Sequence, residues 1–373
     1  MKIGVPVEHA TGERRVALIA ADVTRLAKRG VTVVVEQGAG ARADVPDERY
    51  AEGGAEIAGE AEAWSADLVA VVGPPSPEQV ARMRPGATIA GFLAPLSDTE
   101  LTRALAEAKV TAFAMESVPR ISRAQTMDAL SSQATVAGYR AALIGAELLP
   151  RFYPMFTTAA GTVPPARVLV LGVGVAGLQA LATAKRLGAA TTGYDVRPEV
   201  ADQVRSVGAK WLSLGIEAAG EGGYARALTD EEREEQQRAL TKETTSFDVV
   251  ITTAQVPGRA APRLVTAEAV EGMRPGSVVV DLAGESGGNC ELTEPGQTVV
   301  RRGVTIASPL NLPATLPEHA SQLYSRNLYS LLELLVDKEA ELAPDFDDEI
   351  VAKSCLTRGG DILAGPLRPV GGG

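Results

Sequence analysis

The 373-residue sequence contains only two cysteines and two histidines, and this scarcity excludes whole classes of site. Cys290 and Cys355 stand far apart in the chain, so we expect neither a disulfide framework nor a clustered thiolate metal site. His9 and His319 leave little material for a zinc site or for histidine-based catalysis, and neither has an obvious partner nearby in the sequence. The sequence therefore predicts a protein without a metal centre.

Cations and long apolar runs are also scarce. Lys and Arg number 36 against 47 Asp and Glu, which gives a net charge of −11. Nucleic-acid binding needs a surplus of cations, and an anionic membrane surface would repel this chain. The longest apolar stretch, around Ala87–Leu96, is much shorter than the ~18 residues of a spanning helix. Residues 1–16 have no apolar core of a secretory signal. We expect a soluble, cytoplasmic protein with no nucleic-acid partner and no direct membrane insertion.

What the chain does have is an alternation of short, β-branched apolar runs with longer Ala/Leu helical patterns. This alternation is typical of parallel α/β architecture. We predict two Rossmann-like, doubly wound domains with a cleft between them, linked by long helices. Residues 1–130 with 318–373 form the first, flavodoxin-like domain, and residues 131–317 form the second. The expected strands are Lys2–Val7, Val31–Glu36, Leu68–Val72, Thr88–Phe92 and Thr111–Ala114, then Arg167–Leu171, Ala190–Tyr194, Phe247–Thr253, Ser277–Leu282 and Val304–Ala307.

A glycine fingerprint is the strongest signal in the sequence. The strand ending at Leu171 runs into Gly172-Val-Gly174-Val-Ala-Gly177, and a helix is expected over Leu178–Leu187. In this G-x-G-x-x-G pattern the glycines allow a tight turn, close approach of a pyrophosphate, and close packing of helix on strand. Asp195 follows at the end of the next strand, where a carboxylate accepts the adenine-ribose hydroxyls. The pattern predicts a site for NAD(H) in preference to NADP(H), although Arg197 keeps NADP(H) from being excluded outright.

Two other glycine patterns are interpreted as loops. Gly38-Ala-Gly40-Ala-Arg-Ala43 fits G-x-G-x-x-A but is followed by Asp44-Val-Pro46, so we expect a strand-to-loop turn. Gly284-Glu-Ser286-Gly-Gly288 fits the G-x-S-x-G nucleophile pattern of hydrolases. That elbow needs a following helix and a histidine partner, and this sequence offers neither. We expect a glycine loop at the carboxyl edge of the sheet.

Two polar segments complete the candidate site. Gln125, Asp128 and Ser131 recur every three residues and, if helical, lie along one face close to the predicted domain crossing. The long charged stretch Gly215–Ser246 predicts a flap hinged at its glycines, followed by a solvated helix. A further amphipathic helix is expected over His319–Val336.

Taken together, these motifs resemble the NAD(H)-binding component of proton-translocating nicotinamide nucleotide transhydrogenase, in its separate-chain form. The resemblance runs from Met1 to about Gly359 and is carried by Pro119–Gln133, Thr158–Val168, Gly172–Ala180 and Asp281–Cys290. It implies that Arg120, Gln125 and Asp128 wrap the nicotinamide, with Ser131 beside them, and that Tyr224 belongs to the flap. The expected cofactor-binding residues are Gly172, Gly174, Val175, Ala176, Gly177, Asp195, Val196, Arg197, Tyr224, Thr253 and Ala254.

The resemblance also implies partners and an activity. It implies a homodimer that meets membrane-embedded transhydrogenase subunits, including the beta subunit that binds NADP(H). Hydride would pass directly between NAD(H) on this chain and NADP(H) on the partner, coupled to proton translocation by the membrane partner. The chain would then lie at the inner face of the cytoplasmic membrane, held there through its partners.

Two alternatives stay open at this stage. Alanine dehydrogenase shares the fold and the opening Ile3-Gly-Val-Pro pattern, but it needs a substrate-binding lysine and a catalytic histidine. Gly73 and Ala94 stand at the corresponding positions, and transhydrogenases commonly carry the lysine pattern too, so the loop near Val72 departs from both families. The other alternative is a non-catalytic NAD-sensing module, against which the Arg120–Ser131 pattern argues.

Overall fold

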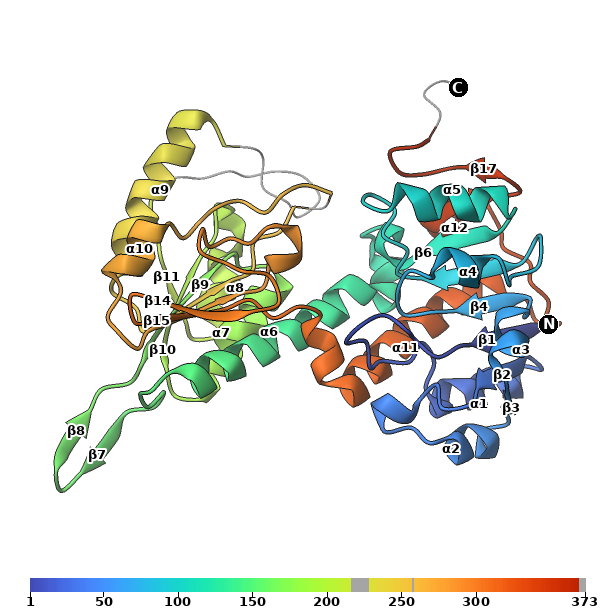
Figure 1. Cartoon of the computed structure of the whole chain (residues 1–373), viewed down its shortest axis with the longest axis horizontal. Helices are drawn as coiled ribbons and strands as arrows, with labels where there is room; N and C mark the ends of the chain where they lie inside the picture. Colours follow the sequence, from blue (N-terminus) through green and yellow to red (C-terminus); the bar gives the residue numbers. More distant parts are fainter. Residues whose placement is uncertain (216–227, 257, 369–373) are drawn as a thin grey trace. The chain divides into compact units, whose positions relative to one another are not determined.

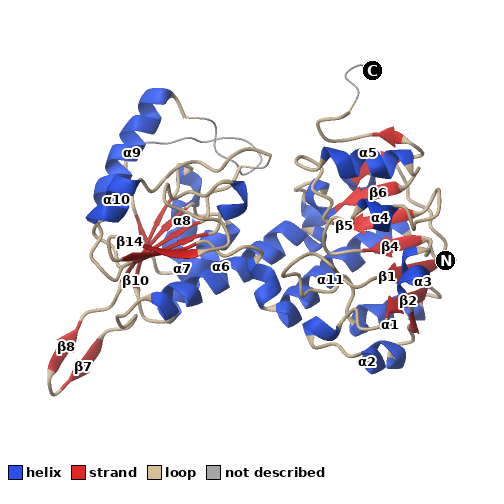
Figure 2. Ribbon diagram, viewed as in Figure 1, coloured by secondary structure: helices blue, strands red, loops and turns tan. Residues whose placement is uncertain are grey.

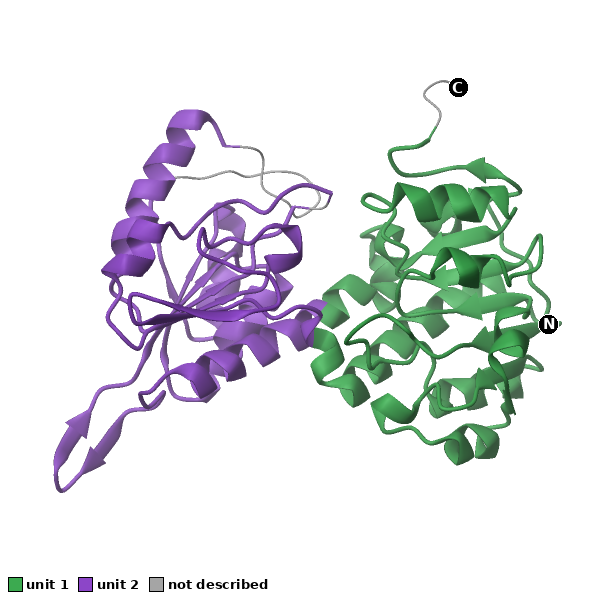
Figure 3. Ribbon diagram, viewed as in Figure 1, with its two compact units in different colours: residues 1–133, 313–373 green, residues 134–312 purple. Residues whose placement is uncertain are grey.

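The chain forms two compact units, each with its own central sheet (Figure 3). A computed structural model describes residues 1–215, 228–256 and 258–368. Unit 1 comprises residues 1–133 and 313–373, and unit 2 comprises residues 134–312. The chain leaves unit 1 within the long helix α6 (Ala129–Leu148) and returns at a 3-10 turn, η6 (Leu312–Thr315).

Unit 1 is built on an eight-stranded sheet in the order β17-β16-β6-β5-β4-β1-β2-β3. All neighbours from β6 to β3 pair in parallel, whereas β16 pairs antiparallel with β6. The order reverses between β1 and β4, which makes this the topological switch point of the unit. The strands are β1 (Lys2–Val5), β2 (Thr32–Glu36), β3 (Glu56–Ala58), β4 (Leu68–Ala70), β5 (Thr88–Gly91), β6 (Thr111–Ala114), β16 (Cys355–Arg358) and β17 (Asp361–Ile362).

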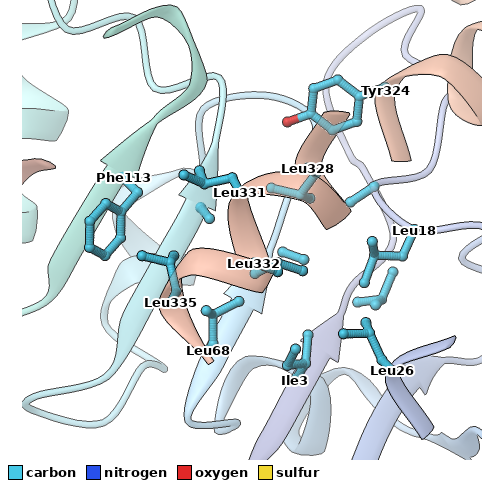
Figure 4. Close-up of a cluster of buried hydrophobic side chains, with 14 of the residues drawn as sticks. Ile3, Leu18, Leu26, Leu68, Phe113, Tyr324, Leu328, Leu331, Leu332 and Leu335 are labelled. Carbon is cyan, nitrogen blue, oxygen red and sulfur yellow. The ribbon is translucent and has the colours of Figure 1, made fainter. Parts of the chain in front are cut away.

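The helix α11 (Pro317–Leu335) runs through the core of unit 1. Figure 4 shows its leucines, from Leu328 to Leu335, facing Ile3, Leu68 and Phe113 of the sheet. One turn before Leu328 the Tyr324 hydroxyl donates to the Val71 carbonyl at 2.7 Å. The remaining helices of the unit are α1 (Ala20–Lys28), α2 (Asp47–Glu52), α3 (Glu60–Trp64), α4 (Pro77–Val80), α5 (Thr99–Glu107) and α12 (Glu349–Ser354).

Unit 2 contains a seven-stranded sheet in the order β11-β10-β9-β12-β13-β15-β14. Its strands pair in parallel except at the edge, where β14 runs antiparallel to β15. The first strand, β9, lies between β10 and β12, so the switch point falls there. The strands are β9 (Arg167–Leu171), β10 (Ala190–Tyr194), β11 (Lys210–Trp211), β12 (Val249–Thr252), β13 (Val278–Asp281), β14 (Thr298–Arg301) and β15 (Val304–Ala307). The helices are α7 (Val175–Arg186), α8 (Ala201–Ser206), α9 (Asp230–Thr244) and α10 (Ala267–Gly272), and the end of α6 packs with them.

These two sheets confirm the predicted fold class of two Rossmann-like, doubly wound α/β units (Figure 2). The solvated helix predicted in the charged stretch is present as α9, but it is not solvated throughout. Leu240 is fully buried, and the amide of Gln236 donates to the hydroxyl of Tyr194 at 2.9 Å. Within the described residues no helix is both long and apolar enough to cross a membrane.

Unit 2 also contains a hairpin that was not predicted from the sequence. Strands β7 (Phe156–Thr158) and β8 (Gly161–Val163) pair only with each other, and every residue in them is exposed. They project from unit 2 between α6 and β9 (Figure 1). The rings of Phe152 and Phe156 lie with their centroids 4.6 Å apart and their planes tilted by 57°, and both rings are exposed.

Candidate functional site

The fingerprint turn after β9 requires glycine at two positions. Gly172 has φ +87°, and a Cβ atom there would lie 2.9 Å from the Ala254 nitrogen. A Cβ on Gly177 would lie 2.1 Å from the Gly172 carbonyl oxygen, far inside van der Waals contact. Any side chain at these two positions would therefore open the turn between strand and helix.

The helix α7 begins directly at this turn with its first backbone N–H groups uncapped by a side chain. Gly174 is the N-cap residue and supplies no side-chain acceptor. Apart from Gly174 and its two chain neighbours, none of the described residues places a heavy atom within 4 Å of the position where a Gly174 Cβ would stand. The first-turn N–H groups of a helix have no partner within the helix, so the N–H groups of Val175, Ala176 and Gly177 need acceptors from outside it, and the space beside Gly174 is open. This arrangement suits an anion such as a pyrophosphate.

Asp195, one residue beyond β10, is buried and accepts from this same turn. Its Oδ2 accepts from the Val173 N–H at 2.8 Å, which ties the end of β10 to the fingerprint. Arg197 forms a two-pronged ion pair with it: Nε donates to Oδ1 at 2.9 Å and Nη2 to Oδ2 at 2.8 Å. Val196, between them, is half-buried and packs against the apolar cluster under the sheet.

Thr253 and Ala254 close the site on the other side of β9, directly after β12. The Thr253 hydroxyl donates to the Gly172 carbonyl at 2.6 Å. Ala254 is held through both of its backbone groups by the side chain of Asn289: its N–H donates to Oδ1 at 3.1 Å, and its carbonyl accepts from Nδ2 at 2.8 Å. The described residues of unit 2 thus bring together the predicted positions from Gly172 to Gly177, Asp195 to Arg197, and Thr253 with Ala254.

Asn289 was not identified from the sequence, although its loop was. The segment Gly284–Ser286 is a short 3-10 turn ending at Gly287, which has φ +94°, so no nucleophile elbow forms there. Asp281, buried at the end of β13, accepts from the Cys290 N–H at 2.9 Å and from the Thr293 hydroxyl at 2.6 Å. The loop is a brace that fixes Ala254, and its only sequence signal was a glycine-rich segment after a strand.

Gln125, Asp128 and Ser131 do not lie on one continuous helix, so the helical face predicted for them does not form. Residues Ser122–Met127 form a 3-10 helix, and α6 begins only at Ala129. Asp128 stands between the two helices and caps the second: its Oδ1 accepts from the Ser131 N–H at 2.9 Å and its Oδ2 from the Ser131 hydroxyl at 2.6 Å. A helix-capping Asx geometry therefore replaces the expected continuous face.

This loop is firmly attached to the core of unit 1 while Arg120 and Gln125 remain exposed on it. Its Ala124 and Met127 side chains are buried in the apolar cluster around α11. The amide of Asn327 on α11 donates to the Thr126 carbonyl at 2.8 Å. Arg123 makes two hydrogen bonds, of 2.6 and 2.8 Å, to the carboxylate of Asp348. That guanidinium lowers the pKa of Asp348 to about 2.

Two carboxylates, the buried Glu8 and the half-buried Glu116, accept hydrogen bonds at the carboxyl ends of β4 and β5 in unit 1. Glu8 accepts from the Val72 N–H at 2.5 Å and from the Gly73 N–H at 3.3 Å, and its burial raises its pKa to about 7. Glu116 accepts from the Ala94 N–H at 2.8 Å, and burial raises its pKa as well. Ala94 itself has φ +49°, so the loop after β5 turns sharply there. Gly73 and Ala94 thus each lie beside a carboxylate, and neither has a positively charged side chain.

The remaining predicted positions are placed as follows. The flap around Gly220–Leu228, with Tyr224, lies almost wholly outside the described residues, so its role stays a prediction. His9 and His319 are both exposed. No three His, Cys, Asp or Glu side chains gather into a metal-binding group in the portion of the chain that the structure describes.

Comparison with known proteins agrees with this architecture. Residues 4–137 match the model of the alanine dehydrogenase/PNT N-terminal domain, and residues 141–365 match that of the C-terminal domain. The chain is 47% identical to the first part of NAD(P) transhydrogenase subunit alpha of Rhodospirillum rubrum, over 97% of this chain and 98% of that protein. A solved transhydrogenase structure from Sinorhizobium meliloti superposes with a TM-score of 0.88 and 43% identity, over 97% of this chain and 100% of that one.

Alanine dehydrogenases are more distant. That of Staphylococcus saprophyticus is 33% identical over 85% of this chain and 82% of its own length. Two family models together cover most of the sequence, and the transhydrogenase relatives match it over almost all of its length. The chain therefore belongs to the alanine dehydrogenase/PNT family, among the alpha subunits of NAD(P) transhydrogenase.

Proposed function

We propose that unit 2 binds NAD(H) and that the chain works as the NAD(H)-binding subunit of a proton-translocating transhydrogenase. The observation that carries this proposal is the turn at the switch point of unit 2. There Gly172 and Gly177 close the turn, α7 presents uncapped N–H groups, and Asp195 accepts from Val173. Such a turn fits a dinucleotide whose pyrophosphate lies at the helix N-terminus and whose adenine ribose meets the carboxylate.

The chain's own residues would divide the work of holding the cofactor. The α7 terminus binds the pyrophosphate, Asp195 selects the unphosphorylated ribose, and Thr253 with Ala254 flank the path toward the nicotinamide. The nicotinamide ring supplies hydride chemistry. We assign Arg120, Gln125, Asp128 and Ser131 to its environment, with Tyr224 in the flap. Ser131 and Asp128 bond to each other, so their role is to fix the loop on which Arg120 and Gln125 are exposed.

The second nucleotide, NADP(H), would be bound by a partner beta subunit, which also couples transfer to proton movement in the membrane. One dinucleotide fingerprint is present here, so hydride transfer needs the partner. Peripheral attachment to the inner face of the cytoplasmic membrane follows from the same partnership. We also propose a homodimer, which is supported by the exposed aromatic pair of Phe152 and Phe156, the first residue of the β7–β8 hairpin. Isolated two-stranded hairpins are marginally stable in water, so such a hairpin needs a partner surface.

Calorimetric titration of the purified chain with NADH and NADPH tests the cofactor assignment. NADH should bind more tightly, and Asp195→Ala should narrow the difference by weakening NADH and strengthening NADPH. Equal affinities in the unmodified chain would contradict the assignment. Mixing the chain with its NADP(H)-binding partner should then restore hydride transfer in stopped-flow measurements.

Alanine dehydrogenase activity is the second candidate, favoured only by the shared family. An amino-acid substrate needs a cation for its carboxylate and an acid–base group at the reacting carbon. Gly73 and Ala94 provide neither, and the neighbouring Glu8 and Glu116 would repel a carboxylate when ionised. We expect no alanine-dependent NADH production by the chain alone, and robust production would overturn the transhydrogenase proposal. A chain that binds NADH but transfers nothing with its partner would instead be a sensing module.

A further inference from the structure

The carboxylate of Asp195 has no free acceptor position left. Oδ1 accepts from the N–H of Arg197 at 2.9 Å and from its Nε at 2.9 Å. Oδ2 accepts from the N–H of Val173 at 2.8 Å and from Nη2 of Arg197 at 2.8 Å. A carboxylate offers about four lone-pair sites, so these four donors fill it.

Only two of these four donors can leave without rebuilding the fold. The N–H groups of Val173 and Arg197 belong to the backbone of the fingerprint turn and of the segment after β10. The other two are the parallel prongs of one guanidinium, and the half-buried side chain that carries them can swing away. The guanidinium uses one site on each oxygen, which is the bidentate geometry that a carboxylate offers best.

A ribose also approaches a carboxylate with two adjacent donors, its 2′- and 3′-hydroxyls. If Asp195 binds the ribose as proposed above, the hydroxyls need the sites that the Arg197 prongs hold. We infer that Arg197 is a selectivity residue of the nucleotide site: its side chain occupies the ribose position of Asp195 and must be displaced by NADH. This inference rests on the proposed NAD(H) site.

Displacement has opposite consequences for the two nucleotides. Arg197 is two residues from Asp195 in the chain, so its freed guanidinium stays close to the ribose. A 2′-hydroxyl gains little from that charge, whereas a 2′-phosphate accepts a bidentate guanidinium readily. Arg197 therefore lowers NADH affinity by competition and raises NADPH affinity by attraction. Both effects reduce the preference for NADH over NADPH that Asp195 alone would give.

The test is calorimetric titration of the full chain and its variants with NADH and NADPH. Arg197→Ala should tighten NADH binding by about threefold and weaken NADPH binding by about tenfold, the scale expected for one charge-assisted contact. Arg197→Lys keeps a cation but cannot span both oxygens, so its NADH affinity should lie between those of Arg197→Ala and the unmodified chain. Arg197→Lys also serves as a control for misfolding, because Asp195 keeps a positively charged neighbour in this variant.

Arg301→Ala is the matched control, because it removes the same charge from β14, at the other edge of the same sheet. It should leave the affinity ratio of the two nucleotides unchanged. Weaker NADH binding by Arg197→Ala, or an unchanged ratio, would overturn the inference while leaving the NAD(H) site standing. Failure of the unmodified chain to bind NADH at all would instead overturn the proposed function.

Discussion

Replacing Glu8 by glutamine should make the stability of unit 1 respond differently to pH. Glu8 is 9% exposed and accepts from the Val72 and Gly73 N–H groups at the end of β4. Burial is the largest cause of its raised pKa, nearby Glu13 adds to the rise, and the Val72 N–H and Arg15 oppose it. Glutamine has nearly the same shape but cannot ionise, so Glu8→Gln isolates the cost of the buried charge.

The size and sign of the effect follow from the pKa values. A folded-state pKa of about 7 against an ordinary value of 4.5 corresponds to about 3 kcal/mol, at roughly 1.4 kcal/mol per pKa unit. Below the ordinary value both states hold the proton, and the charge costs nothing. As pH rises toward the folded-state value, the unfolded chain releases the proton first, so the folded state loses stability. The full cost applies above that pH.

Thermal unfolding of the unmodified chain and of Glu8→Gln between pH 5 and 8.5 measures this cost. The variant should be slightly less stable at pH 5, because its amide N–H₂ faces the Gly73 N–H and leaves that donor unpaired, a loss of about 1 kcal/mol. Its Tm relative to that of the unmodified chain should rise with pH, by roughly 5–10 °C across the range for a unit of this size, because a small part of the cost is already present at pH 5. Glu56→Gln, on an exposed ion pair with Lys2, should show no such crossover. A pH-independent difference between Glu8→Gln and the unmodified chain would refute the reasoning.

Four further predictions address the sites. Gly174→Ala should leave Tm unchanged but weaken NADH binding at least tenfold, because its Cβ enters the open space before α7, whereas Gly177→Ala should lower both Tm and NADH affinity. Calorimetry and thermal melts distinguish the two variants. An NADH affinity in Gly174→Ala equal to that of the unmodified chain would count against a pyrophosphate at this turn. Asp348→Asn keeps the N-cap of α12 but weakens the bond to Arg123, so it should cost about 1 kcal/mol or less in stability yet slow hydride transfer more than it weakens NADH binding. The double variant Arg123→Asp with Asp348→Arg, in which the two charges are exchanged, should recover some of the lost transfer rate. An unchanged transfer rate in Asp348→Asn would show that the loop does not need this ion pair. Gln125→Asn shortens an exposed side chain by one methylene and should likewise reduce the stopped-flow transfer rate far more than the NADH affinity, with an unaffected rate arguing against a positioning role. Phe156→Asp should convert the proposed dimer to a monomer in sedimentation experiments, whereas Val300→Asp, which changes another exposed apolar residue on β14, should not. If Phe156→Asp remains a dimer, the hairpin is not part of the interface.

The sequence alone was sufficient where the determining contacts lie close together along the chain. The fingerprint is one strand, one turn and one helix, so the steric demands at Gly172 and Gly177 are visible in a short pattern. The strands Thr111–Ala114, Arg167–Leu171 and Val304–Ala307 have the bounds expected from the sequence, because buried parallel strands are rich in short apolar runs. Strand-by-strand alternation with helices then determined the fold class.

Tertiary structure decided whatever depends on partners far apart in the sequence. Asn289 braces Ala254 from a loop after β13, and Glu8 closes the end of β4 across the switch point of unit 1. No local sequence pattern at Asn289 or Glu8 predicts these hydrogen bonds, because the order of the strands in the sheet decides which backbone groups each side chain meets. The register of Gln125, Asp128 and Ser131 shows the same limit at short range. Burial of Ala124 and Met127 against α11 and capping by Asp128 stabilise a 3-10 segment and a helix start where residue spacing alone favours a continuous helix.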